Sequence, residues 1–157
     1  MAFGEGRAIG GVGWNVWRAA VGGFYLLSAV FNAAYTVPLA GEADTFEGYA
    51  DGAWFPFLSD FMWDVFIPNA ATFMVFVIIF EIVVGFLILS RGGWVDLGIA
   101  ASLVWVMALL PFLAWPYLLV NVALILVQGA VLLRKYPLSI WQLIGRRFGV
   151  GGSPHPG

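Results

Sequence analysis

The sequence predicts an all-helical membrane protein: one domain, built as a bundle of four transmembrane helices. Of its 157 residues, 62% are apolar and only 10% are charged, whereas a typical soluble domain is roughly 25% charged. The mean hydropathy is +0.93. A core of this size cannot hide so many apolar side chains from water, so the composition excludes a soluble globule, and it equally excludes a disordered chain.

The first two spans are predicted at residues 14–37 and 69–90. A helix needs roughly 20 mostly apolar residues to cross a hydrocarbon core about 30 Å thick. Ala19–Val37 has no charged residue, and Pro38 ends the stretch. The second stretch contains a single charged residue, Glu81, and an Arg-Gly-Gly turn follows it. Both stretches are long enough to cross a bilayer once.

The third and fourth spans share one apolar stretch. Leu97–Leu133 has no charged residue over 37 positions, and one helix of that length would extend about 55 Å, nearly twice the membrane thickness. Pro111 and Pro116 lie in its middle, and a proline disfavours helix at the residue before it. We therefore expect the chain to reverse there, between spans at 94–112 and 115–133.

With four spans, every Lys and Arg falls on one side of the membrane, whereas treating 97–133 as one span would leave four basic residues on the other side. The intervening loop at 39–69 has six acidic residues and no basic one. The positive-inside rule then places both termini in the cytoplasm, in a bacterial or archaeal cytoplasmic (inner) membrane. The basic residues are Arg7, Arg18, Arg91, Arg134, Lys135, Arg146 and Arg147, and the acidic ones are Glu42, Asp44, Glu47, Asp51, Asp60 and Asp64.

Two further helices are expected to lie along the membrane surface. Residues 54–67 form an amphipathic pattern on the outer side, and residues 138–148 combine an apolar stripe with Arg146 and Arg147 on the inner side. Residues 149–157 are expected to be a loose tail. Tryptophans mark the predicted boundaries as an aromatic belt does: Trp54, Trp63, Trp94, Trp115 and Trp141.

Several classes of site are disfavoured. The chain has no cysteine, and its one histidine, His155, lies in the Gly/Pro tail. Disulfides, thiol chemistry and metal sites built on cysteines or paired histidines are therefore excluded. Nucleic-acid binding is not supported, because the basic residues are scattered and the pI is about 5.1.

Glu81 is the one ionisable residue deep inside a span. It lies ten positions before Arg91, which places it roughly 15 Å from the inner boundary. A charge at that depth costs at least about 2.5–3.5 kcal/mol, so the side chain should face the bundle interior and be paired or protonated. Two interpretations remain open: an acid that faces a proton path or a quinone, and a neutral side chain that links two helices.

Six polar residues in the other spans lie at depths that would let them form a polar column with Glu81. Individually, each is better explained by a hydrogen bond between helices, and it is the set of six at graded depths that favours a column. The column consists of Tyr25, Ser28, Asn32, Ser102, Asn121 and Gln128. At the inner end of the first span, Arg18 either reaches toward Glu81 or an anionic group, or anchors the helix beside Trp14 and Trp17.

The pattern resembles the DoxX-like family of small four-helix membrane proteins over about Arg18 to Arg134. The matching pieces are Arg18 with Gly22-Gly23, the run Phe80–Leu89 with its Glu-x-x-x-Gly, Arg91, and Val106-Met107-Ala108. Members of that family are similar to membrane partners of redox systems, including a subunit of thiosulfate:quinone oxidoreductase and a mycobacterial partner of superoxide and thiol defence. The resemblance implies functional interest in Arg18 and Glu81.

Three functions follow as hypotheses. The first is a membrane subunit of a quinone- or proton-linked redox system. Such a subunit would not be catalytic without its partner, and the cofactor that this hypothesis suggests is a quinone. The second is a non-catalytic assembly subunit that docks through the outer amphipathic helix. The third, a small transporter, usually needs more helices or internal symmetry. In each case the partners are the lipid bilayer and either another subunit or a second copy of the chain.

Overall fold

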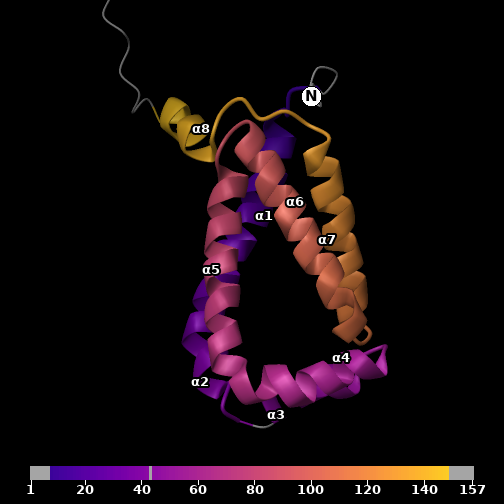
Figure 1. The fold of residues 1–157 in the computed structure, drawn as a ribbon. Helices are drawn as coiled ribbons and strands as arrows, with labels where there is room; N and C mark the ends of the chain where they lie inside the picture. The colour runs from indigo at the N-terminus through magenta and orange to yellow at the C-terminus, as the bar shows by residue number, and fades with distance from the viewer. Residues whose placement is uncertain (1–7, 43, 149–157) are drawn as a thin grey trace, which may run out of the picture.

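The computed structural model describes residues 8–42 and 44–148, and helices dominate this part of the chain. Four helices stand upright in Figure 1. Two further helices, α3 (Asp44–Asp51) and α4 (Pro56–Phe61), lie across one end of them, and a separate helix, α8 (Ile140–Arg147), lies at the other end. The upright helices are α1 (Val12–Phe31), α5 (Ala70–Leu89), α6 (Gly93–Leu109) and α7 (Tyr117–Leu132). The others are η1 (Asn32–Thr36), α2 (Val37–Leu39), η2 (Met62–Phe66), η3 (Ile67–Asn69) and η4 (Leu110–Phe112). The tail expected at 149–157 lies outside the described residues.

Three helical stretches of the described chain are long and apolar enough to cross a membrane, as expected of a helical membrane protein. They are Val12–Leu39, Pro56–Leu89 and Gly93–Phe112. The fourth expected span corresponds to α7, which has 16 residues. At a rise of about 1.5 Å per residue, α7 extends about 24 Å, slightly less than the hydrocarbon core.

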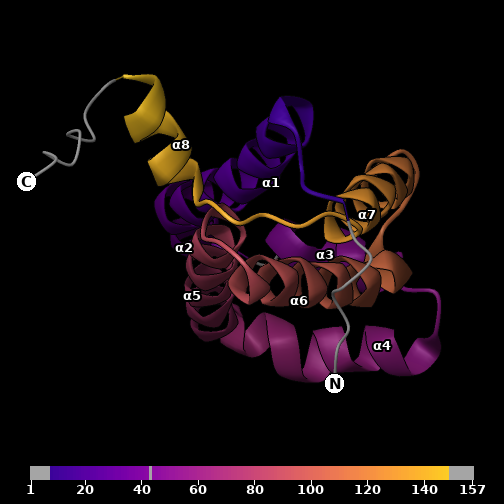
Figure 2. The ribbon, with the colours of Figure 1, turned by 90° about the horizontal axis from the view of Figure 1, so that it is seen from above.

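The stretch from Pro56 to Leu89 bends between its amphipathic and apolar parts. Figure 1 shows α4 lying across the end of α5, and Figure 2 shows it from above along the edge of the bundle. Pro68 explains the bend, because a proline cannot donate the helical hydrogen bond and its ring clashes with the carbonyl four residues earlier. A π-helical turn, η2, precedes it. The surface helix expected at 54–67 thus corresponds to α4, η2 and η3.

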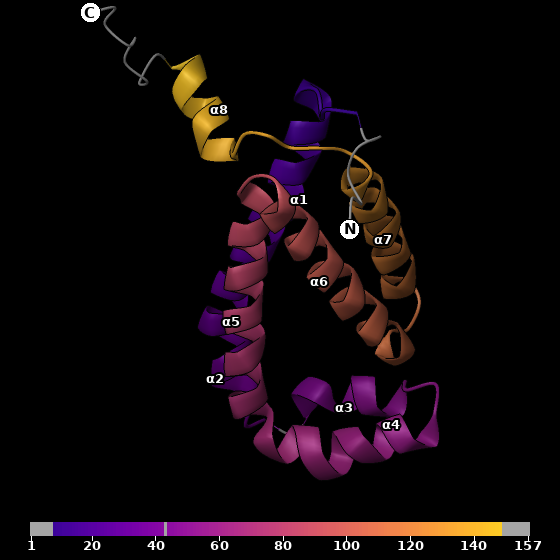
Figure 3. The same cartoon turned by 45° about the horizontal axis from the view of Figure 1, so that its top comes forward.

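Helices α1 and α5 lie side by side along most of their length (Figure 3). The close approach depends on Gly22 and Gly85, which face each other. A Cβ atom added at Gly85 would lie 2.7 Å from the Leu26 side chain and 3.1 Å from the Gly22 carbonyl oxygen. Only residues without a side chain allow the two backbones to come this near, which is a common device between membrane helices.

The chain reverses between α6 and α7, within the segment where the two prolines predict a turn. Pro111 lies in the short 3-10 turn η4, which ends α6, and Pro116 directly precedes α7. The backbone N–H of Trp54 donates to the Pro111 carbonyl at 2.9 Å. This bond ties the segment before α4 to the far end of α6, so the crossing helices bridge α5 and α6.

The buried side chains form two separate hydrophobic cores. One lies where α1, α5, α6 and α7 meet near α8, and the other lies where α3 and η2 meet the far ends of α2 and α5. The first core comprises Val21, Tyr25, Val84, Ile88, Val95, Ile99, Val131 and Tyr136. The second comprises Ala40, Phe46, Ala50, Met62, Ala70 and Met74.

Charge is divided between the two ends of the molecule. The α3–α4 end contains the described acidic loop, and we call it the acidic end. All the described Lys and Arg residues lie at the other end, in the start of α1, the α5–α6 turn, the end of α7 and α8. Asp96, in the first turn of α6, lies at this end as well. We call this the basic end. The five boundary tryptophans are all exposed, between 40% and 70%.

Candidate functional site

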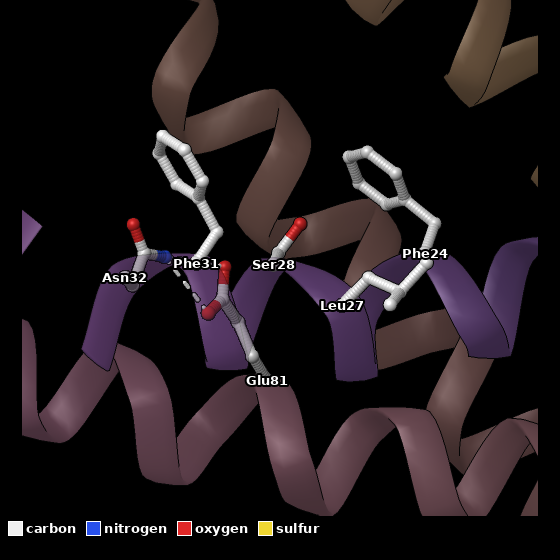
Figure 4. A pocket seen from close by; sticks show the side chains of 6 residues that line it. All are labelled: Phe24, Leu27, Ser28, Phe31, Asn32 and Glu81. Carbon is white, nitrogen blue, oxygen red and sulfur yellow. Dashed lines mark hydrogen bonds between the residues drawn. The ribbon is translucent and has the colours of Figure 1, made fainter. Parts of the chain in front are cut away.

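Glu81 is buried against α1 and is held there by Asn32. Its side chain is 6% exposed. The Asn32 amide Nδ2 donates to both carboxyl oxygens, at 3.1 Å to Oε1 and 2.9 Å to Oε2 (Figure 4). An acid buried in an apolar bundle requires such a partner, because an unpaired one loses its hydration without compensation. The Asn32 amide supplies that partner from the neighbouring helical segment.

The orientation of Asn32 is set by the π-helical turn that it begins. The Thr36 hydroxyl donates to Asn32 Oδ1 at 2.8 Å. With its oxygen engaged in this way, the amide turns its nitrogen, which is purely a donor, toward Glu81. Single π turns inside membrane or soluble helices occur frequently at functional sites. Thr36 is a site residue that the sequence analysis missed, although its position four residues after Asn32 was a usable signal.

A pocket of about 280 Å³ opens beside the Glu81–Asn32 pair. In Figure 4, Ser28 lies one turn before Asn32 with its hydroxyl directed away from the carboxyl group, and the aromatic rings of Phe24 and Phe31 stand on either side of it. Phe24, Leu27 and Phe31 are 49%, 71% and 59% exposed, so the pocket opens at the surface of the bundle. An apolar rim with a few convergent polar groups suits a ligand with a hydrophobic body and a polar head.

A second polar cluster lies nearer the basic end and joins three helices. The Ser102 hydroxyl on α6 hydrogen-bonds to Gln128 Oε1 on α7 and lies 2.9 Å from the Ile99 carbonyl. The Tyr25 hydroxyl on α1 interacts with both Ser102 and Gln128. All three of these polar side chains are almost completely buried.

The residues expected to form one polar column instead form two adjacent clusters, and one of them, Asn121, belongs to neither cluster. Ser28 and Asn32 lie beside Glu81, whereas Tyr25, Ser102 and Gln128 form the second cluster. Asn121 instead donates to the carbonyl of Tyr117 in its own helix, at 3.0 Å. Counting residues from the inner boundary gave the depths, but it could not give the direction in which each side chain points.

Arg18 does not reach Glu81, and the suggested contact between them is corrected. Its side chain is fully buried at the basic end. Nη1 donates to the Ser90 carbonyl at 3.2 Å and Nη2 to the Leu138 carbonyl at 3.0 Å, while the guanidinium lies 4.6 Å from the centre of the Tyr136 ring. A cation beside the last carbonyls of α5 also complements the helix dipole. Arg18 thus connects α1, α5 and the segment before α8.

The described residues contain no group of three or more His, Asp or Glu side chains placed to hold a metal ion. Comparisons with protein-family models, with curated proteins and with solved structures found no match to this chain. The geometry of the Glu81 pocket is therefore the basis on which a function can be assigned.

Proposed function

We propose that this chain is a membrane subunit of a quinone-linked redox system, and that a quinone head group binds in the Glu81 pocket. The observation that carries the proposal is the buried carboxyl of Glu81, paired with Asn32 and lining an open, aromatic-rimmed pocket. A quinone presents carbonyl oxygens on a flat apolar ring, and a protonated carboxyl or an amide can donate to such oxygens. Phe24 and Phe31 offer faces against which the ring would stack.

The accompanying topology is four crossings with both termini in the cytoplasm of a bacterial or archaeal cell. The separation of basic and acidic ends supports this orientation through the positive-inside rule. In this arrangement α4 lies on the outer surface and α8 on the inner surface. The DoxX-like pattern of Arg18 and the Glu81-x-x-x-Gly85 segment agrees with a redox-associated membrane subunit.

The chemistry assigned to Glu81 is proton transfer. Reduction of a quinone to a quinol consumes two electrons and two protons, and the electrons would come from a cofactor in a partner subunit. Glu81 supplies one of the two protons to a reduced quinone oxygen and is reprotonated by water, and the second proton reaches the other oxygen from water as well. A positioned general acid of this kind typically accelerates a reaction by about 10²–10⁴-fold.

The test is Glu81→Gln in the complex purified with its partner from mild detergent. We expect quinone-linked electron transfer to fall by about 100-fold or more, while the complex stays assembled because Gln can still accept from Asn32. Glu42→Gln, at an exposed acid of the acidic end, is the matched control and should leave the rate unchanged. An unchanged rate in Glu81→Gln would refute the proposal.

An assembly subunit without catalytic participation is the second candidate, favoured by the exposed aromatic side chains at the acidic end. Trp54, Phe55 and Phe57 are 52%, 49% and 66% exposed. If they dock a partner, then Phe57→Ser should release the partner during purification while the Glu81 pocket keeps its ligand. Co-purification that is unaffected by Phe57→Ser would count against this candidate.

A further inference from the structure

The helix α8 at the basic end has an exposed apolar face that nothing in the described chain covers. Trp141, Ile144 and Phe148 are 56%, 45% and 73% exposed. They lie three and four residues apart and so share one side of the helix. Figures 1 and 2 show α8 projecting from the bundle, away from the upright helices. Only Ile140, at its start, is buried against the rest of the chain.

Although it projects, α8 is a well-formed helix with a fixed point of attachment. Ser139 and Gln142 form a capping box, with the Gln142 N–H donating to Ser139 Oγ at 3.2 Å and the Ser139 N–H donating to Gln142 Oε1 at 2.9 Å. Directly before it, the Leu138 carbonyl accepts from buried Arg18. The Gly92 N–H also donates to the Tyr136 carbonyl at 2.8 Å. These bonds hold the base of α8 at the level where α5 ends.

The charge beside the apolar face is positive. Arg146 and Arg147 occupy the last turn of α8, and Arg91 lies in the α5–α6 turn that is bonded to the segment before α8. The acidic residue described at this end is Asp96, in the first turn of α6. A helix with an apolar face beside arginines matches the boundary between acyl chains and anionic head groups.

We propose that α8 binds anionic phospholipid head groups of the bilayer that holds the protein, with Trp141, Ile144 and Phe148 inserted beneath them. Arg146 and Arg147 contact the phosphates, and Arg18 acts as a positioning residue that keeps the start of α8 at the membrane surface. The proposal does not depend on what the Glu81 pocket binds.

The absence of cysteine allows a clean test, because a single introduced cysteine carries the only label. A spin label is placed at Ile144→Cys, on the apolar face, or at Gln142→Cys, an exposed position outside that face, and the protein is reconstituted in bilayer discs. Discs of phosphatidylcholine alone are compared with discs containing phosphatidylglycerol. Accessibility to oxygen reports immersion in the bilayer, and accessibility to a water-soluble nickel complex reports exposure to water.

With phosphatidylglycerol, we expect the label at 144 to be accessible to oxygen and the label at 142 to be accessible to nickel. The two arginines together predict roughly a 30-fold larger ratio of immersed to detached α8 in anionic discs than in neutral discs. The double change Arg146→Gln and Arg147→Gln should make the immersion of α8 equal in the two kinds of disc. High salt should reduce the difference between them. Arg91→Gln, which removes one charge from the same end but not from α8, is the control and should retain most of it.

Three results would overturn the proposal. Equal immersion in neutral and anionic discs would remove the role of the head-group charge. A label at 144 that nickel reaches freely would place the apolar face in water. A label at 144 that neither reagent reaches would show that a protein surface, from a partner or a second copy, covers this face.

Discussion

The side-chain amide of Asn32, the first residue of η1 directly after α1, donates to both carboxyl oxygens of Glu81 on α5 and joins residues 49 positions apart. The pair lies beyond the Gly22–Gly85 contact in the same helix–helix interface. It therefore serves two purposes: it helps to hold α1 against α5, and it presents a carboxyl group to the pocket.

The first prediction concerns the energy of this pair. Asn32→Leu leaves a buried carboxyl without its donor, so we expect the free energy of unfolding in detergent micelles to fall by about 1–3 kcal/mol. Combining it with Glu81→Leu should restore much of the loss, because neither polar partner then remains. A double-mutant cycle measures the coupling.

The control for that cycle is Asn121→Leu, because Asn121 bonds only to its own helix in the described structure. It should change stability by less than about 0.5 kcal/mol. A coupling between positions 32 and 81 within about 0.3 kcal/mol of zero would mean that the two side chains do not interact.

The second prediction concerns Arg18. Arg18→Met removes two charge-assisted hydrogen bonds to the Ser90 and Leu138 carbonyls, and we expect the free energy of unfolding to fall by about 2–4 kcal/mol. The segment at 136–139 should also become more sensitive to protease. Arg91→Met, at an exposed arginine of the same end, should behave like the parent protein. Equal protease sensitivity in both variants would show that Arg18 does not hold this segment.

The third prediction contrasts two glycines. A Cβ at Gly85 would meet the Leu26 side chain and the Gly22 carbonyl, whereas one at Gly23 meets nothing within 4 Å. Gly85→Ala should therefore destabilise the protein by about 1–3 kcal/mol, while Gly23→Ala should be neutral or stabilising by up to about 1 kcal/mol. Thermal unfolding of the two variants side by side decides this, and a reversed order would mean that α1 and α5 do not meet at Gly85.

The fourth prediction concerns the number of crossings. In the cysteine-free chain, a membrane-impermeant maleimide should label Asp51→Cys in intact cells and Gly145→Cys only after lysis. Three crossings, by α5, α6 and α7, then separate the two positions. If both cysteines are labelled in intact cells, or neither is, then the number of crossings between them is even and α7 does not span the bilayer.

The sequence predicted much of the fold because apolar length, proline position and charge are local signals. The helix boundaries of α5 and α7 fall within a few residues of the expected spans at 69–90 and 115–133. The helix α3 was missed because Asp44–Asp51 has no long apolar stretch. It is held in place mainly by Phe46 and Ala50, which are buried in the second core.

For the candidate site, the sequence predicted how deep each polar residue lies in its span, but not the direction in which its side chain points. Glu81 could be identified because a charged residue within a span is conspicuous, and Asn32 was a member of the expected column. Which helix faces Glu81 depends on the rotation of α1 and on its π turn, and neither has a sequence signal of its own. The partners of Arg18 are backbone carbonyls, which every residue possesses, so no side-chain pattern could reveal them.

The division of the buried side chains into two cores has a consequence for how the molecule comes apart. Among the described residues, no buried side chain belongs to both cores, and they are connected chiefly through α1, α2 and α5. Amide exchange should therefore report two cooperative units instead of one. The backbone amide protons of α3 and α4, at the acidic end, would exchange first, while the amides around Ile88 and Ile99 stay protected.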